Sequence, residues 1–365
     1  MAQKGYNPDP KMWVDSSIKE SDVRFISVRE KPFRLYGFYD PLGEPDFKRL
    51  PDEIGQNVSK GVAALYRNTA GGRVRFSTDS RYIAIRAVMP DAKDLPHSQM
   101  PLTGSSGFDL YLDDPDGKAS HFVGPFMPPA HLSGGYESII EFGDRRVRHF
   151  TVHFPLYANV QELFVGIEES ATLGEGLAYE KEPPIVYYGS SITQGGCASR
   201  GGMAYEAIIA RRLNRDFLNL GFSGSGKAED LIIDYMTTLP MRIFVADYDH
   251  NAPSPDYLRA THQTMYQAIR RAHPSVPYLM ISRPDFVWYH DPSHEKGSIE
   301  RKKVILDIYQ AARDAGDENV YFLDGEEFFR GNTDYTVDAT HPNDLGFARM
   351  ADVIGDCLAE ILSRP

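Results

Sequence analysis

A serine, an aspartate and a histidine in this sequence have the types and surroundings that nucleophilic catalysis requires. Ser191 lies in Gly-Ser-Ser-Ile-Thr, residues 189–193, directly after an apolar run. Asp338 and His341 lie close together in Asp-Ala-Thr-His near the end of the chain. Such a set offers a nucleophile, a base that takes its proton and a carboxylate that orients the base. We therefore expect these three residues to form a catalytic triad that attacks a carbonyl carbon.

The second half of the chain has the alternating pattern of strands and helices that would position the triad. Its strand-like apolar runs cover residues 185–188, 217–220, 243–246, 278–282 and 320–323. Segments with helical periodicity follow these runs, and the last one leads to the end of the chain. This order predicts a doubly wound α/β domain with a five-stranded parallel sheet. Reactive groups on such sheets lie on loops at the carboxyl ends of strands, which is where Ser191 falls.

The first half of the chain shows short alternating strands between turn residues. These strand-like runs cover residues 73–76, 82–88, 108–112, 148–154 and 163–167. No long helical period interrupts them, which predicts an antiparallel β-sandwich or jelly roll. A stretch rich in Gly, Glu and Pro at residues 174–184 favours a boundary there. We predict a sandwich domain over residues 1–180 and a catalytic domain over residues 181–365.

Four short blocks in the second half resemble, in order, those of the SGNH, or GDSL-type, hydrolase family. Residues 189–193 resemble the nucleophile block, and residues 338–341 match the last block. Between them, the final glycine of Asn-Leu-Gly-Phe-Ser-Gly is Gly224, and the asparagine of Asp-Tyr-Asp-His-Asn is Asn251. The resemblance implies a flavodoxin-like α/β/α hydrolase domain that cleaves esters through an acyl-enzyme on Ser191.

The resemblance also assigns an oxyanion hole. Ester cleavage builds negative charge on a carbonyl oxygen, which the amides of Ser191 and Gly224 and the side chain of Asn251 would stabilise. The sequence departs from the family pattern at Ser190, where the family has an aspartate, and around Asn251, which lacks the usual Gly-x-Asn-Asp spelling. The poorer alternatives to Asn251, neither of which follows the third strand, are Asn219 and Asn343.

A second resemblance lies in the first half of the chain. Gly-Phe-Asp-Leu-Tyr at residues 107–111 is similar to the Gly-x-Asp-Leu-Tyr signature of a β-sandwich domain that precedes some SGNH hydrolases. Chains of this layout resemble carbohydrate esterases that remove acetyl groups from plant polysaccharides. The resemblance implies a carbohydrate acetylesterase for hemicellulose oligosaccharides, such as acetylated mannan or xylan. The alternative is that Asp109 simply caps or pairs inside a sandwich.

The segment after the fourth strand carries side chains suited to binding a sugar. Trp288 can stack on a sugar ring, while Arg283 and His290 can hydrogen-bond to hydroxyl groups. His250, next to Asn251, can line the same pocket. Each assignment has a structural alternative, because an aromatic side chain here can belong to the core and His250 can be a packing histidine.

Composition narrows the classes of partner. A net charge of −12 disfavours nucleic acid and anionic lipid, and it favours neutral glycans over acidic ones. The glycine-rich residues 221–226 imitate a phosphate loop, but the ribose-binding acid is missing at the expected distance. We expect no cofactor and no metal, including at the two cysteines, Cys197 and Cys357, which we expect to be reduced. With no signal peptide or membrane span visible in the sequence, we expect a cytoplasmic protein.

Two other functions fit the same residues. An acyltransferase would use the same triad and pass the acyl group to an alcohol other than water. A carbohydrate-binding protein would use its sandwich and keep only a residual hydrolase domain. The sequence leaves the oligomeric state open, with a homodimer among the alternatives.

Overall fold

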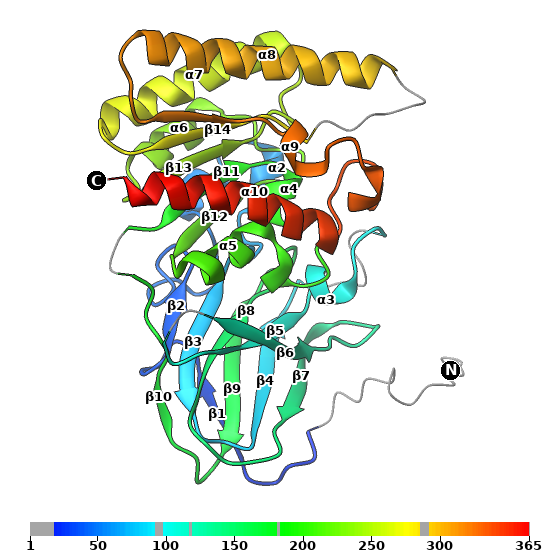
Figure 1. Ribbon diagram of the computed structural model, residues 1–365. Coiled ribbons are helices and arrows are strands. Elements are labelled where there is room, and N and C mark those ends of the chain that lie inside the picture. Colours follow the sequence, from blue (N-terminus) through cyan, green and yellow to red (C-terminus); the bar gives the residue numbers. More distant parts are fainter. Residues whose placement is uncertain (1–17, 92–97, 117–118, 181–182, 285–291, 365) are drawn as a thin grey trace.

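The computed structural model describes residues 18–91, 98–116, 119–180, 183–284 and 292–364. Within these ranges the chain forms two layered parts that are stacked on each other (Figure 1). The lower part in that view holds the antiparallel strands of the first half of the chain. The upper part holds the sheet and the long helices of the second half. The change of pattern along the sequence therefore corresponds to a change of architecture.

The first half folds as two antiparallel sheets around a shared core. One sheet contains β1 (Val23–Ser27), β9 (Glu162–Glu168), β4 (Tyr82–Met89) and β7 (Gly134–Glu141), in that order. The other contains β10 (Leu173–Glu175), β3 (Arg73–Thr78), β8 (Arg148–His153), β5 (Phe108–Asp113) and β6 (Ser120–Phe126), with β2 (Arg34–Tyr36) also beside β3. Alternate apolar side chains from both sheets, such as Phe76, Ile85 and Val165, are buried in one cluster. The predicted β-sandwich is confirmed.

The second half forms a five-stranded parallel sheet with the order β12-β11-β13-β14-β15. Its strands are β11 (Ile185–Gly189), β12 (Phe217–Gly221), β13 (Ile243–Asp247), β14 (Tyr278–Ile281) and β15 (Val320–Leu323). Counted from its own first strand, the order is 2-1-3-4-5, which is the flavodoxin-like order. Gly189 lies in register with both Gly221 and Asp247. The loops after β11, β12 and β13 therefore leave the sheet at the same edge.

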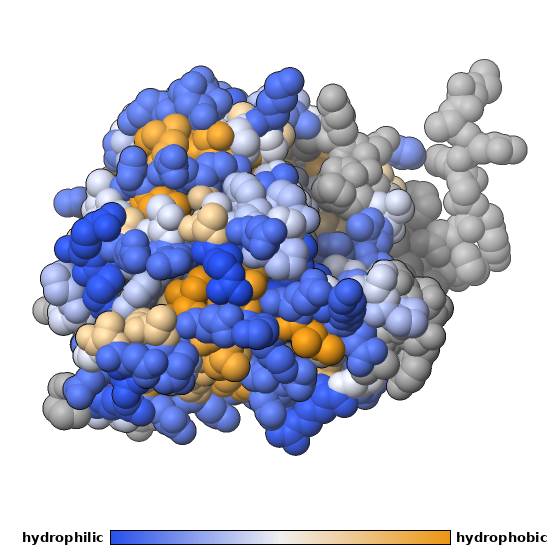
Figure 2. All heavy atoms as spheres, turned by 90° about the horizontal axis from the view of Figure 1, so that it is seen from above, coloured by the Kyte–Doolittle hydropathy of each residue, from blue (hydrophilic) through white to orange (hydrophobic). Residues whose placement is uncertain are grey.

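Helices cover both faces of the parallel sheet. One face carries α5 (Tyr205–Leu213) and α10 (Asp344–Ser363), and the other carries α6 (Asp230–Thr237), α7 (Pro255–Ala272) and α8 (Pro292–Asp314). Along β11, Ile185 and Tyr187 belong to the first buried cluster, whereas Val186 and Tyr188 belong to the second. This is the pattern of a strand that is buried on both sides. Seen from above, the molecule is mostly hydrophilic, with apolar patches between the polar side chains (Figure 2).

Two short helices of the first half pack with the second half. They are α1 (Asp52–Gly55) and α2 (Lys60–Leu65). Leu50 and Val62 join the same buried cluster as Tyr188 of the parallel sheet. The sequence analysis did not predict these helices, because each is too short to display a helical period.

Arg73 of β3 connects the sandwich to the parallel sheet. Its side chain is fully buried, and its guanidinium carbon lies 3.9 Å from the centre of the Phe217 ring. It also forms an ion pair with Asp216, immediately before β12. Along the chain, β10 ends at Glu175 and β11 begins at Ile185, on either side of the boundary predicted at residue 180. No helix in the described ranges is both long and apolar enough to cross a membrane.

Candidate active site

Ser191 lies at the end of the first strand of the parallel sheet. β11 ends at Gly189, and a single helical turn, α4 (Ser191–Gln194), begins almost immediately. Ser190 caps this turn, because its hydroxyl accepts a hydrogen bond from the Ile192 amide at 3.2 Å. The serine that replaces the family's aspartate thus has a local structural function. Ser191 itself is 9% exposed, so its hydroxyl lies at the floor of the site.

His341 and Asp338 complete a continuous chain of hydrogen bonds with Ser191. The Ser191 Oγ lies 2.9 Å from His341 Nε2, and His341 Nδ1 lies 2.8 Å from Asp338 Oδ2. A tight turn holds the two residues together, with Ala339 in the left-handed region at φ 65°. Asn343 then caps α10 by accepting from the Gly346 amide at 3.0 Å. The short spacing of Asp338 and His341 therefore follows from a turn that leads directly into a helix.

The Asp338 carboxylate is stabilised in its charged form. Partial burial acts to raise its pKa, but hydrogen bonds from the His341 amide and imidazole outweigh burial and hold the pKa below its ordinary value. The amide of Thr340 also donates to Asp338 Oδ1, at 3.1 Å. Asp338 is therefore ionised at neutral pH, as a carboxylate that orients an imidazole must be.

The backbone amides of Ser191 and Gly224 lie at this edge, and neither has a hydrogen-bond acceptor within the described part of the chain. Gly224 has φ 65°, and a Cβ built on it would meet no atom within 4 Å. The preceding residue is fixed, because the Ser223 amide donates to Gln194 Oε1 at 2.9 Å. The loop after β12 thus carries a free amide, on a defined backbone, at the same edge of the sheet as Ser191.

Asn251 lies on the loop after β13, close to the loop that contains Gly224. Its Nδ2 donates to the Phe222 carbonyl at 3.0 Å. A side-chain amide has two N–H groups, so one remains for another acceptor. The structure brings Ser191, Gly224 and Asn251 to one edge of the sheet, and their function as an oxyanion hole stays a prediction.

Tyr157, on the sandwich loop after β8, lies directly behind the nucleophile. Its hydroxyl donates to the Ser191 carbonyl at 3.3 Å, and its side chain also hydrogen-bonds Ser223. Burial raises its pKa well above the ordinary value, so the hydroxyl stays protonated. One tyrosine therefore links the nucleophile turn to the loop that carries Gly224. Sequence reasoning missed it, because nothing near residue 157 marks a link to residues far along the chain.

Further hydrogen bonds with the first half support the same loops. The Gln194 side chain donates to Asn68 Oδ1 and to the Leu156 carbonyl, each at 3.2 Å. Arg49 is 4% exposed, and its guanidinium donates to the carbonyls of Asn219 and Gly221 at the end of β12. The first half of the chain thus holds both loops that flank the nucleophile.

Asp109, the aspartate of the Gly-x-Asp-Leu-Tyr motif, is fully buried between the two parts. Its Oδ1 lies 2.8 Å from His153 Nδ1 within the sandwich, and its Oδ2 accepts from the Gly202 amide at 2.8 Å. It therefore pairs inside the sandwich, and it also fixes the segment that leads into α5. That segment is joined to the first turn of α10, since the Ser199 amide donates to Asp344 Oδ1 at 2.8 Å.

Of the predicted substrate-binding residues after β14, only Arg283 lies within the described part of the chain. Trp288 and His290 lie outside the described residues. Arg283 is buried, and its guanidinium donates to Ser298 Oγ at 2.9 Å and to the His294 carbonyl at 3.3 Å. These N–H groups of Arg283 therefore bond to residues near the start of α8. A contact of Arg283 with sugar hydroxyl groups stays a prediction.

His250 is near the triad. Burial lowers its pKa well below the ordinary value, and the charges of Arg283 and His341 lower it further. The side chain is therefore neutral at neutral pH and close enough to His341 to sense its charge. It can donate or accept a hydrogen bond but does not add a positive charge to the site.

Cys197 lies against the His341–Asp338 pair, a position that no feature of the residues around it predicted. One donor atom each from Cys197, Asp338 and His341 lies within 4.8 Å of the others. Burial raises the pKa of the thiol to about 12, and the charge of Asp338 adds to the effect. A protonated thiol is a poor nucleophile, so Cys197 does not compete with Ser191.

Two carboxyl groups are buried behind the nucleophile turn. Glu206 on α5 and Asp247 at the end of β13 are 0% and 1% exposed. Burial raises the pKa of each well above its ordinary value, and Asp247 further raises that of Glu206. Asp247 Oδ2 accepts hydrogen bonds from Thr193 and Tyr205. Burial therefore favours the neutral acid form of both groups.

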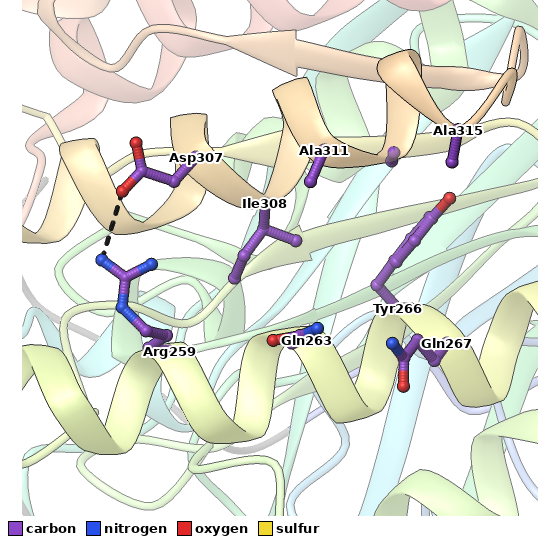
Figure 3. A pocket seen from close by; sticks show the side chains of 9 residues that line it. Arg259, Gln263, Tyr266, Gln267, Asp307, Ile308, Ala311 and Ala315 are labelled. Carbon is purple, nitrogen blue, oxygen red and sulfur yellow. Dashed lines mark hydrogen bonds and ion pairs between the residues drawn. The ribbon is translucent and has the colours of Figure 1, made fainter.

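A cavity of about 280 Å³ lies elsewhere, between α7 and α8 (Figure 3). Its walls include Tyr266, Ile308 and the ion pair of Arg259 with Asp307 at 3.2 Å. None of the predicted site residues lines it. The hydrogen-bonded set around Ser191 is therefore the candidate active site.

Two family models match the chain in succession. Residues 182–359 match the GDSL-like lipase/acylhydrolase family. Residues 23–173 match the N-terminus of SGNH-hydrolase-type esterases, a model named for the GxDLY motif. Comparison with curated proteins gave no match. The two models together span both parts of the fold.

Three solved structures that share the two-part fold are described as three different kinds of enzyme. A GDSL-like lipase from Bacteroides ovatus is 27% identical, with a TM-score of 0.84, covering 93% of this chain and 98% of that chain. The salicylyl-acyltransferase of a tetracycline biosynthetic pathway is 20% identical, with a TM-score of 0.76, covering 95% and 99%. An acetyl xylan esterase from the rumen bacterium Butyrivibrio proteoclasticus is 11% identical, with a TM-score of 0.58, covering 94% and 99%. The latter two similarities concern the fold.

Proposed function

Because the chain belongs to the SGNH, or GDSL-type, hydrolase family and is a carboxylic ester hydrolase, we propose that it removes O-acetyl groups from carbohydrates through an acyl-enzyme on Ser191. The observation that carries this proposal is the unbroken hydrogen-bond chain from Ser191 through His341 to Asp338. Its distances of 2.9 and 2.8 Å are those that proton transfer requires.

The mechanism follows from this chain. His341 Nε2 accepts the Ser191 proton as Oγ attacks the acetyl carbonyl carbon, and a tetrahedral intermediate forms. Its collapse breaks the bond to the sugar oxygen, which takes the proton from His341, and leaves an acetyl group on Ser191. Water then attacks the acetyl group by the same route, and acetate leaves. Asp338 keeps the proton on Nδ1 and stabilises the imidazolium.

The oxyanion of each tetrahedral intermediate needs donors that are already in place. We assign this function to the amides of Ser191 and Gly224, with the second N–H of Asn251 as a third donor. Neither amide has another acceptor within the described ranges, so no existing hydrogen bond has to break. A single donor of this kind typically contributes about 3 kcal/mol to lowering the barrier.

The proposed substrates are neutral acetylated oligosaccharides of the xylan or mannan type. The net charge of −12 favours a neutral glycan, because an acidic one would be repelled on approach. The acetyl xylan esterase shares the two-part fold, and its name makes acetylated xylan fragments the first substrates to test.

The decisive experiment measures acetate release from acetylated xylo- and manno-oligosaccharides by mass spectrometry. The wild type is compared with Ser191→Ala and with Ser170→Ala, which removes an exposed hydroxyl bonded to Arg145 in the sandwich. We expect the wild type and Ser170→Ala to release acetate equally. Ser191→Ala should lose activity by a factor on the order of 10⁴ or more. Equal release by Ser191→Ala would contradict the assignment of the nucleophile.

Two additions to the same assay separate the alternatives. Turnover of p-nitrophenyl acetate without release from any oligosaccharide would retain the esterase and reject the carbohydrate substrate. Acetyl transfer to an added alcohol at the expense of free acetate would identify an acyltransferase. Glycan binding by the full chain without any turnover would instead support a carbohydrate-binding protein.

A further inference from the structure

Cys197 lies beside the triad, and the proposed mechanism does not use it. Its side chain is 5% exposed and lies close to the His341–Asp338 pair. Within the described ranges, Cys197, Asp338 and His341 are the one group of three or more His, Cys, Asp or Glu residues close enough to share an ion. The three donor types, thiolate, imidazole and carboxylate, are those that Zn²⁺ accepts in proteins.

The geometry is close to what such an ion requires. Two donor atoms on a tetrahedral Zn²⁺ lie roughly 3.5 Å apart, given bond lengths of about 2.0–2.3 Å. The donor atoms here lie within 4.8 Å of one another, so side-chain rotations alone could bring them to one ion. Asp338 and His341 are 33% and 21% exposed, which leaves a path from solvent.

The backbone at Cys197 is also unusual. The residue has φ 77°, in the left-handed region that a residue with a Cβ rarely adopts. Gly195 and Gly196 precede it, and a Cβ on Gly196 would lie 3.3 Å from His341 Cδ2. The turn that follows Ser191 therefore runs directly beneath the His341 imidazole. A left-handed position of this kind usually holds a glycine, but here it holds a cysteine whose thiol lies near the imidazole.

We propose that Cys197, Asp338 and His341 form an inhibitory site for a thiophilic divalent cation, Zn²⁺ or Cd²⁺. The metal forms bonds to Cys197 Sγ, to an imidazole nitrogen of His341 and to a carboxylate oxygen of Asp338. The Sγ–H bond breaks, and its proton goes to the buffer. With the imidazole and carboxylate held by the metal, His341 no longer takes the Ser191 proton. The inhibition rests on the proposed function, whereas the binding of the metal does not.

The test therefore measures binding separately from turnover. The full-length chain, free of metal, is titrated with Cd²⁺, and the ultraviolet charge-transfer band of a cadmium–thiolate bond is recorded. Cys197→Ser removes the thiol, and Cys197→Gly does so while relieving the left-handed strain, so at least one variant should fold well. Cys357→Ser is the matched control, because Cys357 is the other free cysteine and lies on α10.

We expect one Cd²⁺ per chain, with the thiolate band present in the wild type and in Cys357→Ser and absent from both Cys197 variants. In parallel, Zn²⁺ inhibition of p-nitrophenyl acetate hydrolysis should weaken at least ~10-fold when Cys197 is replaced. Equal metal affinity in the wild type and both Cys197 variants would overturn the proposal, as would absence of the band up to millimolar metal. If no ester is turned over, the absorbance titration still decides the binding site, and only the proposed function fails.

Discussion

The two parts of the molecule contribute to the candidate site at different distances from the reacting atoms. From the parallel-sheet part, Ser191, Gly224 and His341 come together at the edge of the sheet where we propose that the ester is cleaved. From the sandwich part, Tyr157 and Arg49 reach the backbone behind these residues. The first group can act on the reaction directly, whereas the second can act only by fixing the position of the first.

This difference predicts a graded response to substitution. Residues of the parallel-sheet part that act on the ester directly should affect turnover by orders of magnitude. Residues of the sandwich part should affect it by a factor of a few, because a hydrogen bond that fixes a loop contributes only about 0.5–1.5 kcal/mol. If the sandwich served solely as an independent binding module, substitutions in it would not change turnover in this way.

The largest effect in this comparison is expected for Asp338→Asn. The change keeps the shape of the side chain but removes the charge that stabilises the imidazolium and fixes its tautomer. We expect kcat on p-nitrophenyl acetate to fall by a factor of ~10³–10⁴. Asp334→Asn is the matched control, since Asp334 is exposed and lies four positions away in the same loop. A loss of similar size in Asp334→Asn would mean that loop structure, rather than the carboxylate, determines turnover.

A smaller loss is expected for Gly224→Ala. The methyl group meets no neighbouring atom, but φ 65° is strained for alanine, so the free amide should move. We expect kcat to fall ~10²-fold with little change in KM, because the oxyanion exists only after attack. Gly316→Ala carries the same penalty, at φ 89° and without close neighbours, outside the site. If both variants lose stability equally and neither loses kcat, Gly224 is not an oxyanion donor.

The sequence allowed the fold and the motif residues to be predicted because each is encoded locally. Apolar runs predicted all five strands of the parallel sheet, and alternating runs predicted β3, β4, β5, β8 and β9 of the sandwich but not its other strands. Short motifs predicted the placement of Ser191 and His341. Tyr157, Arg49 and Cys197 were not predicted as neighbours of the site. Their partners lie far along the chain or on backbone carbonyls, which leave no pattern in side-chain spacing. The contacts of Tyr157 and Arg49 with the site form only when the two parts of the fold stack on each other.

Tyr157→Phe tests the sandwich contribution most directly. It removes a hydroxyl that bonds the Ser191 carbonyl and Ser223 but keeps the ring. We expect kcat to fall roughly 3- to 10-fold at nearly constant KM, which is the size of effect expected when hydrogen bonds that position a loop are lost. Tyr136→Phe is the control, because that buried hydroxyl donates to the Phe126 carbonyl at 2.9 Å within the sandwich. A merely structural function would lower the melting temperature in both variants and leave kcat unchanged in both.

The smallest effect on turnover is expected for Glu206→Gln, which instead changes how stability depends on pH. Burial raises the pKa of Glu206 in the folded state, so the folded chain holds a proton that the unfolded chain releases above about pH 4.3. This group's contribution to stability is therefore complete at low pH and declines as pH rises toward the folded pKa, by at most ~1.4 kcal/mol per pH unit.

Glutamine resembles the neutral acid and cannot ionise. Relative to the wild type, Glu206→Gln should therefore become more stable as pH rises from 5 to 8, as measured by urea unfolding at each pH. Glu318→Gln, at an exposed position, should follow the wild type throughout. Parallel curves for Glu206→Gln and the wild type would show that Glu206 is ionised in the folded protein. The carboxyl groups behind the nucleophile turn would then be part of the electrostatics of the site rather than neutral packing, and the parallel-sheet part would itself contain a second layer of charge behind Ser191.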